Sequence, residues 1–494
     1  MRYLLLIFLF LTTLTYGQEK RRIIVLTDPN IDIRKETDDA MSLVRLMVYS
    51  NEFDIEGLIA TCSHNMEYRY VKPIHDAIDA YELVLPNLRN HADGYPSPNS
   101  LRAVTALGPE RYATQFALNE EPISPGAEVM INAINKDDDR PIWVQIWGDG
   151  AVIAQVLEYI RNTEGQVAVD LAVSKLRILD LAGQDDSGAW LMGHYPDLWY
   201  IRWVDQYVAM DPMSDVNLNF YPQCGECAKG DPYYTNDEWV ANNVQNHGPL
   251  GDVYPDRRYL KEGDTPTMLY MIPNGLNNPN NPWEGSWGGR TTREPIEGLR
   301  SYLDPLGPPD MRELAETDFD PYYMYGLEDD RWTNHLGNTY TSTYVTIFRW
   351  WEDFQNDFAS RMDWSIQSSY NNANHPPEIT NEREEIGVFK GDIIYLSSLV
   401  SDPDGDLLNY KWWYYKEPGT YSNDVIINNS TEAECEVSIP IDAVGSEIHI
   451  ILSVTDNGTP VLTRYKRVII NVYETFIDII PPSVPYDLFY KVFI

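Results

Sequence analysis

The chain has 494 residues, of which 43% are hydrophobic and 12% are aromatic, so it is long enough for two or three domains with sizeable cores. Its 37 Lys and Arg residues against 75 Asp and Glu residues give a formal net charge of -38. This charge disfavours binding to nucleic acid or to an anionic membrane surface, and it is compatible with a neutral ligand or a cation.

The first 17 residues have the features of a secretory signal peptide. Arg2 precedes the apolar run LLLIFLFL, and small and polar residues follow as far as Gly17. The apolar run is shorter than an ordinary transmembrane span. We therefore expect a signal peptide over residues 1–17, cleavage near Gly17, and a secreted or periplasmic protein that does not insert into a membrane.

Residues 20–372 alternate strand-like and helical patterns. Strand-like IIVLT precedes helical AMSLVRLMVYS, DIEGLIATCS precedes AIDAYELV, and PIWVQIW precedes GAVIAQVLEYI and then KLRILDL. This order predicts an α/β domain in which a mainly parallel sheet is flanked by helices on both faces. Ligands bind at the carboxyl ends of the strands in such sheets, and the residues that fall just past those ends are Asp28, Ser63, Gly148 and Gln184.

Residues 274–290, NGLNNPNNPWEGSWGGR, contain too many Asn, Pro and Gly residues for a helix or a central strand. Long loops in compact domains are usually functional or disordered. The aromatic rings of Trp283 and Trp287 could stack on a sugar, and Arg290 could bind its hydroxyl groups. The alternative is that the tryptophans only cover the core.

After the sequence NHPP, short strand-like runs separated by turn signals occupy residues 376–474. They predict an all-β sandwich of the size of an immunoglobulin-like domain. Asp402, Asp404 and Asp406 alternate in a turn of this region, where they either hold calcium or simply form the turn. Residues 475–494 do not follow the sandwich pattern and are expected to form a C-terminal tail.

The four cysteines divide into two groups. Cys224 and Cys227, in C-G-E-C, could form a small disulfide in an oxidising compartment. Cys62 and Cys435 lie in strand-like runs and are expected to be buried thiols.

Three carboxylates, Asp28, Asp38 and Asp39, surround the end of the first predicted strand and the start of the first predicted helix. Such carboxylates repel one another unless a cation lies between them, and calcium prefers oxygen ligands. The alternative is that Asp38 and Asp39 only stabilise the amino end of the helix. Gln184 and Asp185, after a third strand, could contact sugar hydroxyls or cap the next helix.

The arrangement resembles the nucleoside hydrolases, whose first strand ends in a D-P-G-x-D-D motif. The resemblance implies that Asp28 activates water and that Asp38 contacts the sugar. It also implies calcium ligands at Asp28, Asp39 and Asp264, the last in EGDTPTMLY, and a carbonyl ligand near Ala151. The insertion between the D-P and D-D parts is longer here than in that motif.

The resemblance is closer to secreted nucleoside hydrolase-like proteins described as cellulose-binding, in which a β-sandwich follows this domain. The segments that carry it are RLMVYSNEFDIEGLIAT, NHGPLG, EGDTPTMLY, NDFASRMDW, SDPDGD and VTDNGTP. It implies a nucleoside hydrolase-like fold followed by an immunoglobulin-like sandwich. His247, in NHGPLG, either lines the pocket or orders a turn.

The chain also departs from true nucleoside hydrolases. Gly263 stands where a His often precedes the last metal ligand, and Leu26 stands where that family usually has an Asp. The leading interpretation is therefore a secreted, calcium-dependent glycosyl hydrolase-like protein that acts on a carbohydrate, either a polysaccharide or a glycoside. One alternative is a non-catalytic protein that binds cellulose or another polysaccharide, and the second is a nucleoside N-ribohydrolase.

Overall fold

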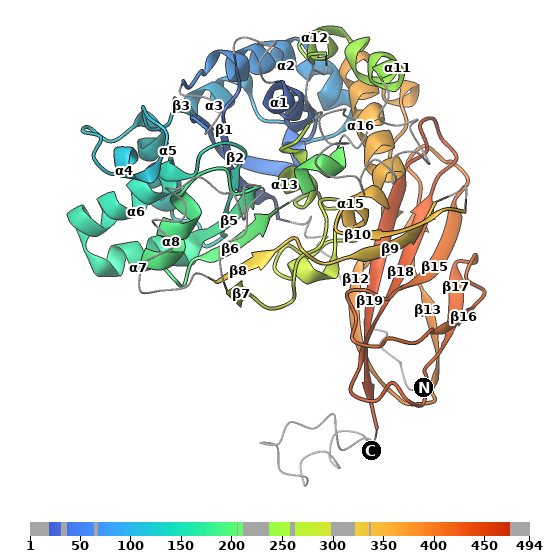
Figure 1. The fold of residues 1–494 in the computed structure, drawn as a ribbon. Coiled ribbons are helices and arrows are strands. Elements are labelled where there is room, and N and C mark those ends of the chain that lie inside the picture. The colour runs from blue at the N-terminus through green and yellow to red at the C-terminus, as the bar shows by residue number, and fades with distance from the viewer. Residues whose placement is uncertain are drawn as a thin grey trace, which may run out of the picture.

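The computed structural model describes residues 19–30, 37–63, 68–204, 206–210, 237–256, 262–297, 322–334 and 337–474. The predicted signal peptide, the predicted tail and the C-G-E-C pair lie outside these residues. Among the helices of the described part, none is long and apolar enough to cross a membrane. Figure 1 shows a part that contains helices and strands, followed by a part built of strands.

An eight-stranded sheet forms the centre of the first part, in the order β3-β2-β1-β4-β5-β6-β8-β7. Only the β7–β8 pair is antiparallel. The predicted, mainly parallel sheet is therefore confirmed. Its strands are β1 (Arg21–Thr27), β2 (Phe53–Ala60), β3 (Thr105–Leu107), β4 (Ile142–Ile146), β5 (Leu176–Leu181), β6 (Trp199–Trp203), β7 (Ile296–Glu297) and β8 (Tyr322–Tyr325).

Helices cover both faces of this sheet, as the sequence predicts. Because side chains alternate along a strand, Ile23 and Val25 of β1 join one core and Ile24 and Leu26 join the other. The first core includes residues of α1 (Asp38–Val48), α2 (Lys72–His91), α13 (Thr265–Leu269) and α16 (Trp351–Ile366). The second includes residues of α5 (Pro125–Ile134), α6 (Ala151–Glu164), α7 (Gln166–Lys175) and α8 (Ser187–His194).

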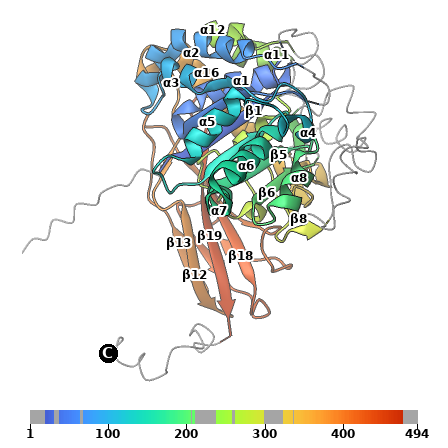
Figure 2. The same cartoon turned by 90° about the vertical axis from the view of Figure 1, so that its left-hand side faces the viewer.

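Shorter helices complete this part around the sheet (Figure 2). They are α3 (Pro98–Ala103), α4 (Thr114–Ala117), α11 (Asp237–Val240), α12 (Gly248–Asp252) and α15 (Val345–Phe348).

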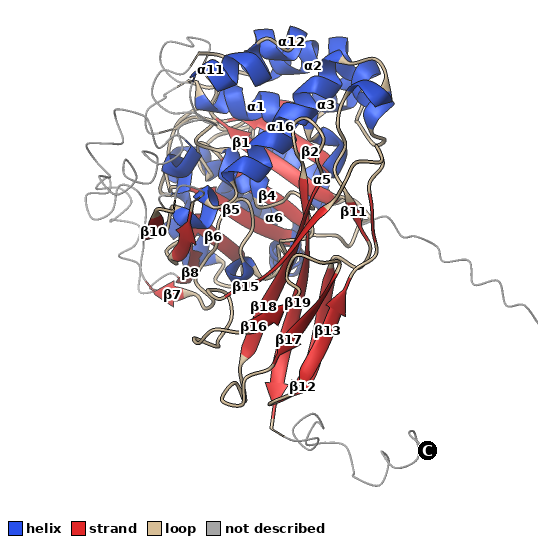
Figure 3. Cartoon of the chain, turned by 90° about the vertical axis from the view of Figure 1, so that its right-hand side faces the viewer, coloured by secondary structure: helices blue, strands red, loops and turns tan. Residues whose placement is uncertain are grey.

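The second part is a sandwich of a four-stranded sheet, β12-β19-β18-β15, and a three-stranded sheet, β13-β17-β16 (Figure 3). Its core contains Trp412 and Cys435, and Cys62 is buried in the first part, so both predicted buried thiols are confirmed. The strands are β12 (Arg383–Phe389), β13 (Ile393–Ser397), β15 (Asn409–Tyr415), β16 (Ile426–Asn428), β17 (Glu434–Ser438), β18 (Glu447–Thr455) and β19 (Thr463–Tyr473). Two small sheets pair β9 (Asp330–Thr333) with β10 (Thr339–Ser342) and β11 (Glu378–Ile379) with β14 (Val400–Ser401).

Candidate functional site

Strand β1 lies between β2 and β4, and its carboxyl end carries Thr27 and then Asp28. One oxygen of the Asp39 carboxylate accepts hydrogen bonds from the Thr27 hydroxyl and, at 3.1 Å, from the Asp28 amide. These bonds attach the first turn of α1 to the strand end. They also show that the Asp39 carboxylate does more than stabilise the amino end of its own helix.

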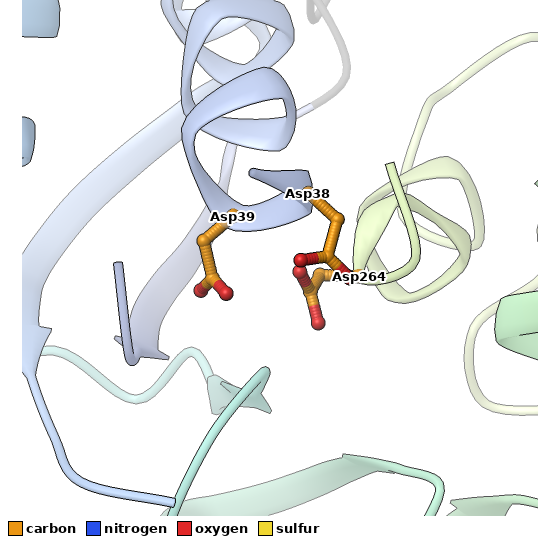
Figure 4. A group of neighbouring side chains, drawn as sticks. All are labelled: Asp38, Asp39 and Asp264. Carbon is orange, nitrogen blue, oxygen red and sulfur yellow. The ribbon is translucent and has the colours of Figure 1, made fainter. Parts of the chain in front are cut away.

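Asp264 immediately precedes α13, and the fold brings it to the start of α1. Carboxylate oxygens of Asp38, Asp39 and Asp264 lie within 4.8 Å of one another. Figure 4 shows the three side chains directed from the starts of the two helices toward the same space. We call this group the acidic cluster.

The acidic cluster is electrostatically unfavourable when all of its members are charged. Burial raises the pKa of Asp38 to about 6. Burial, and next the charge of Asp38, raise the pKa of Asp39 to about 7. A bound cation would relieve this repulsion, and the all-oxygen donor set fits a hard divalent ion such as calcium. The three aspartates would then be ligands of the ion.

Asp28 lies beside the acidic cluster rather than within the group of three. Its side chain lies over Gly148, which follows β4: a Cβ atom at Gly148 would be 2.5 Å from Asp28 Oδ1. A glycine at this position therefore leaves space for the Asp28 carboxylate at the strand edge. The amide of Asp28 is bound to Asp39, so its position is coupled to that of the cluster.

A second pair of carboxylates, Asp149 and Asp185, follows β4 and β5, and the sequence analysis named Asp185 but missed Asp149. Burial raises the pKa of Asp149 to about 6. Burial, and next the charge of Asp149, place the pKa of Asp185 well above its ordinary value. Each carboxyl group is among the causes of the other's shift, so the two titrate together. The available signal was the sequence GDG directly after the strand PIWVQIW.

Gln184 and Asp185, expected either to contact a sugar or to cap the next helix, hold neighbouring loops together. Asp185 accepts hydrogen bonds from the Gly150 amide, at 3.0 Å, and from the Ser187 hydroxyl, at 2.7 Å. The Gln184 side-chain amide donates to the carbonyl of Trp147. A contact of either side chain with a sugar stays a prediction.

Ala151, the predicted carbonyl ligand, is the first residue of α6. In an α-helix the carbonyl of residue i accepts the amide of residue i+4. The Ala151 carbonyl is therefore directed along α6, and its role as a calcium ligand stays a prediction.

His247 immediately precedes α12, and its Nε2 atom lies 2.9 Å from a carboxylate oxygen of Asp363 on α16. The contact joins two helices, so of the two predicted roles the structure favours the ordering of this segment.

The loop that contains Trp283, Trp287 and Arg290 packs between the two parts of the chain. Trp287 is 0% exposed, and its indole donates a 3.3 Å hydrogen bond to the hydroxyl of Tyr465 in β19. Arg290 is buried in a 2.8 Å ion pair with Asp330. These contacts give Trp287 and Arg290 a role in domain packing in place of the expected sugar contact.

Further contacts of the same loop support this correction. The amide of Tyr465 donates to the carbonyl of Asn274 at 3.0 Å. The guanidinium of Arg467 donates to the carbonyls of Leu276 and Glu284, each at 2.9 Å. Trp283 is half-buried, and its ring lies 5.6 Å from the guanidinium carbon of Arg293.

The triad predicted in the sandwich, Asp402, Asp404 and Asp406, also brings carboxylate oxygens within 4.8 Å of one another. Asp402 accepts the amides of Asp404 and Asp406, each at 3.0 Å, as a turn requires. Asp404 also accepts the amide of His375 at 2.7 Å. The triad therefore joins the sandwich to the segment that precedes it.

Comparisons with known proteins agree on one family. The family described as "Cellulose-binding Sde182, nucleoside hydrolase-like domain" matches residues 22–291. The family described as "Cellulose-binding protein Sde0182, C-terminal domain" matches residues 393–472. Both parts of the predicted architecture are thereby confirmed. The curated proteins give no match.

A solved structure extends the similarity over nearly the whole chain. It is described as a nucleoside hydrolase-related hypothetical protein from Saccharophagus degradans that is associated with carbohydrate metabolism. The two are 34% identical with a TM-score of 0.76, over 92% of this chain and 100% of that one. Protocadherin gamma C5 EC1-3 aligns with 20% of this chain and 33% of its own at 15% identity, and its TM-score of 0.13 does not indicate a shared fold.

Proposed function

The chain belongs to the cellulose-binding Sde182 family with a nucleoside hydrolase-like domain, and on this premise we propose that it is a secreted, calcium-dependent glycosyl hydrolase-like protein that acts on a glycan or a glycoside. The observation that carries the proposal is the acidic cluster at the carboxyl edge of the parallel sheet. The description of the family as cellulose-binding supports both a carbohydrate ligand and a location outside the cell.

The proposed chemistry divides two tasks, calcium binding and activation of water, among four carboxylates. Asp38, Asp39 and Asp264 would hold calcium, which supplies positive charge and coordination sites for sugar hydroxyl groups. Asp28, at the edge of the cluster, would accept a proton from the attacking water. An oxocarbenium-like transition state would be stabilised by these negative charges.

Calcium titration by calorimetry tests the metal site directly. We expect the wild-type protein to bind calcium and Asp264→Asn to bind it at least about tenfold more weakly, because a charged ligand is lost. The matched control is Asp170→Asn, which removes the same charge from an exposed position on α7. Equal calcium binding by wild type and Asp264→Asn would exclude the acidic cluster as the site.

Hydrolysis is tested separately, on a panel of glycosides that includes nucleosides. Asp28→Asn keeps the shape of the side chain and removes its basicity, so we expect turnover to be lost even at a calcium concentration that saturates the variant. Turnover by the Asp28→Asn variant at the wild-type rate would refute the role of Asp28 as the base.

The second candidate function is polysaccharide binding without catalysis. The observation that favours it is Gly263, which provides no side chain to assist a leaving group next to Asp264. Pull-down on insoluble cellulose, with and without a chelator, discriminates the two functions. Retention on cellulose together with no turnover of any glycoside would favour the binding protein.

A further inference from the structure

A cavity of about 780 Å³ lies outside the ends of β2 and β3. Leu107, the last residue of β3, and Ser63, shortly after β2, form its base. Two arginines and four aromatic residues form most of the remaining wall: Arg69, Arg111, Tyr68, Tyr70, Tyr112 and Phe116. This composition provides flat apolar rings and positive charge in one place.

Among the described residues, no carboxylate lies within 4.0 Å of the guanidinium group of Arg69 or of Arg111. The Nε atom of Arg69 is buried without a hydrogen-bond partner in that part of the chain. By contrast, the buried Arg45 and Arg202 form ion pairs of 2.5 and 2.7 Å. An exposed guanidinium such as that of Arg111 tolerates the lack of a partner, but the buried Nε donor of Arg69 without one is costly.

Arg111 is held by an aromatic ring instead of an acid. Its guanidinium carbon lies 3.6 Å from the centroid of the Phe116 ring, which fixes the group by a cation–π contact and leaves its N–H donors available. Glu110 is the one carboxylate among the residues that line the cavity, and it is exposed. The lining therefore carries two guanidinium groups against one carboxylate, and Arg111 is exposed as well.

This cavity adjoins the candidate active site. The hydroxyl of Tyr112 donates a 2.9 Å hydrogen bond to the carbonyl of Gln184, and the amide of Ala113 donates to Asp149 at 3.3 Å. Arg69 and Asp28 both act electrostatically on the buried thiol of Cys62. The cavity therefore lies at the same edge of the sheet as Asp28 and Asp149.

We propose that this cavity binds the anionic substituent, a carboxylate or a sulfate ester, of an acidic sugar. The inference rests on the proposed function, because it names the class of substrate that reaches the acidic cluster. Guanidinium groups match planar and tetrahedral oxyanions through paired N–H donors, and the tyrosine rings offer faces for sugar rings. A neutral glucan such as cellulose has no group that would use the two free charges.

Binding calorimetry with three trisaccharides tests the proposal: trigalacturonate, a sulfated galactose trisaccharide, and neutral cellotriose. The variants are Arg69→Gln and Arg111→Gln. The matched control is Arg102→Gln, whose guanidinium is already paired with Asp79 and Glu82. We expect at least one acidic trisaccharide to bind about tenfold more tightly than cellotriose, and each cavity variant to lose about tenfold in that affinity. Cellotriose binding and the control should not change.

The two acidic probes distinguish carboxylate from sulfate ester, and tighter binding of either supports the proposal. Equal binding of all three trisaccharides, or unchanged binding of the acidic ones by both cavity variants, would overturn it. So would equally tight binding of inorganic sulfate, because the sugar would then contribute nothing. Repeating the titration with Asp264→Asn separates the two proposals: arginine-dependent binding supports the cavity even if the calcium titration fails.

Discussion

Without calcium, the Asp39→Asn variant should be more stable than the wild-type protein. With calcium bound, it should be less stable than the wild-type protein. Two unit charges at the 4.8 Å limit of the acidic cluster repel by about 3.5 kcal/mol at an effective dielectric constant of about 20. The asparagine oxygen can still accept the hydrogen bonds from Thr27 and from the Asp28 amide. After screening by salt, we expect a net stabilisation of about 1 to 3 kcal/mol without metal.

Calcium should reverse this order. At a concentration 1,000 times the dissociation constant, a bound ligand adds about 4.1 kcal/mol to the stability of the wild type, and the variant should gain much less because it lacks one charged ligand. The assay is thermal unfolding with a chelator or with calcium, at pH 8.5, which lies above the pKa of Asp38 and of Asp39. Asp170→Asn is the control for the loss of one charge. An Asp39→Asn variant that melts below wild type in chelator, together with no calcium-induced shift in wild type, would refute the reasoning.

Two further predictions concern the junction of the two parts. Gly275→Ala should destabilise the protein by about 2 kcal/mol or more, because its φ is +87° and a Cβ atom would lie 1.9 Å from the carbonyl oxygen of Tyr465. Gly405→Ala is the control, because Gly405 has a φ of +82° and open space around it. The measurement is the urea midpoint of unfolding, and an equal shift of this midpoint in both variants would show that the junction contact is unimportant. The contribution of the His91–His375 pair to stability should fall as the pH drops from about 7.5 to 5.5, opposite to the effect of the buried carboxyl groups, whose raised pKa favours the folded state at lower pH. His91 Nδ1 lies 3.0 Å from His375 Nε2, and burial lowers the pKa of both side chains. Below the pKa that the two histidines have in the unfolded chain, the unfolded chain therefore binds more protons than the folded protein. The midpoint of thermal unfolding measured against pH checks this, and a His375→Gln variant with the same pH dependence as wild type would contradict it.

The fold class followed from local sequence patterns, because each pattern is set by neighbours along the chain. The strand Ile23–Thr27 and the helix after it were visible as an apolar run followed by helical periodicity. The alternation of Ile23 with Ile24 between the two faces of the sheet needs no distant information either. The order of strands and helices then restricts the topology to a mainly parallel sheet.

The loop with Trp287 shows where local reasoning failed. Tryptophans among Asn, Pro and Gly residues are as compatible with a sugar-binding surface as with an interface between two domains. The decision depends on Tyr465, which lies 178 residues later in the chain and meets Trp287 only after the sandwich has docked.

The sequence by itself determined the β1–α1 region, in which Asp28 lies at a strand end and Asp38 and Asp39 begin a helix, because adjacent residues fix this geometry. Only the tertiary structure decided which carboxylates meet. Asp264 joins Asp38 and Asp39 because α13 packs beside α1, and Asp149 faces Asp185 because β4 and β5 are neighbours in the sheet. Only the fold shows that Arg69 has no ion-pair partner among the described residues. An ion pair depends on the distance between two side chains in space, and their separation along the chain does not give it.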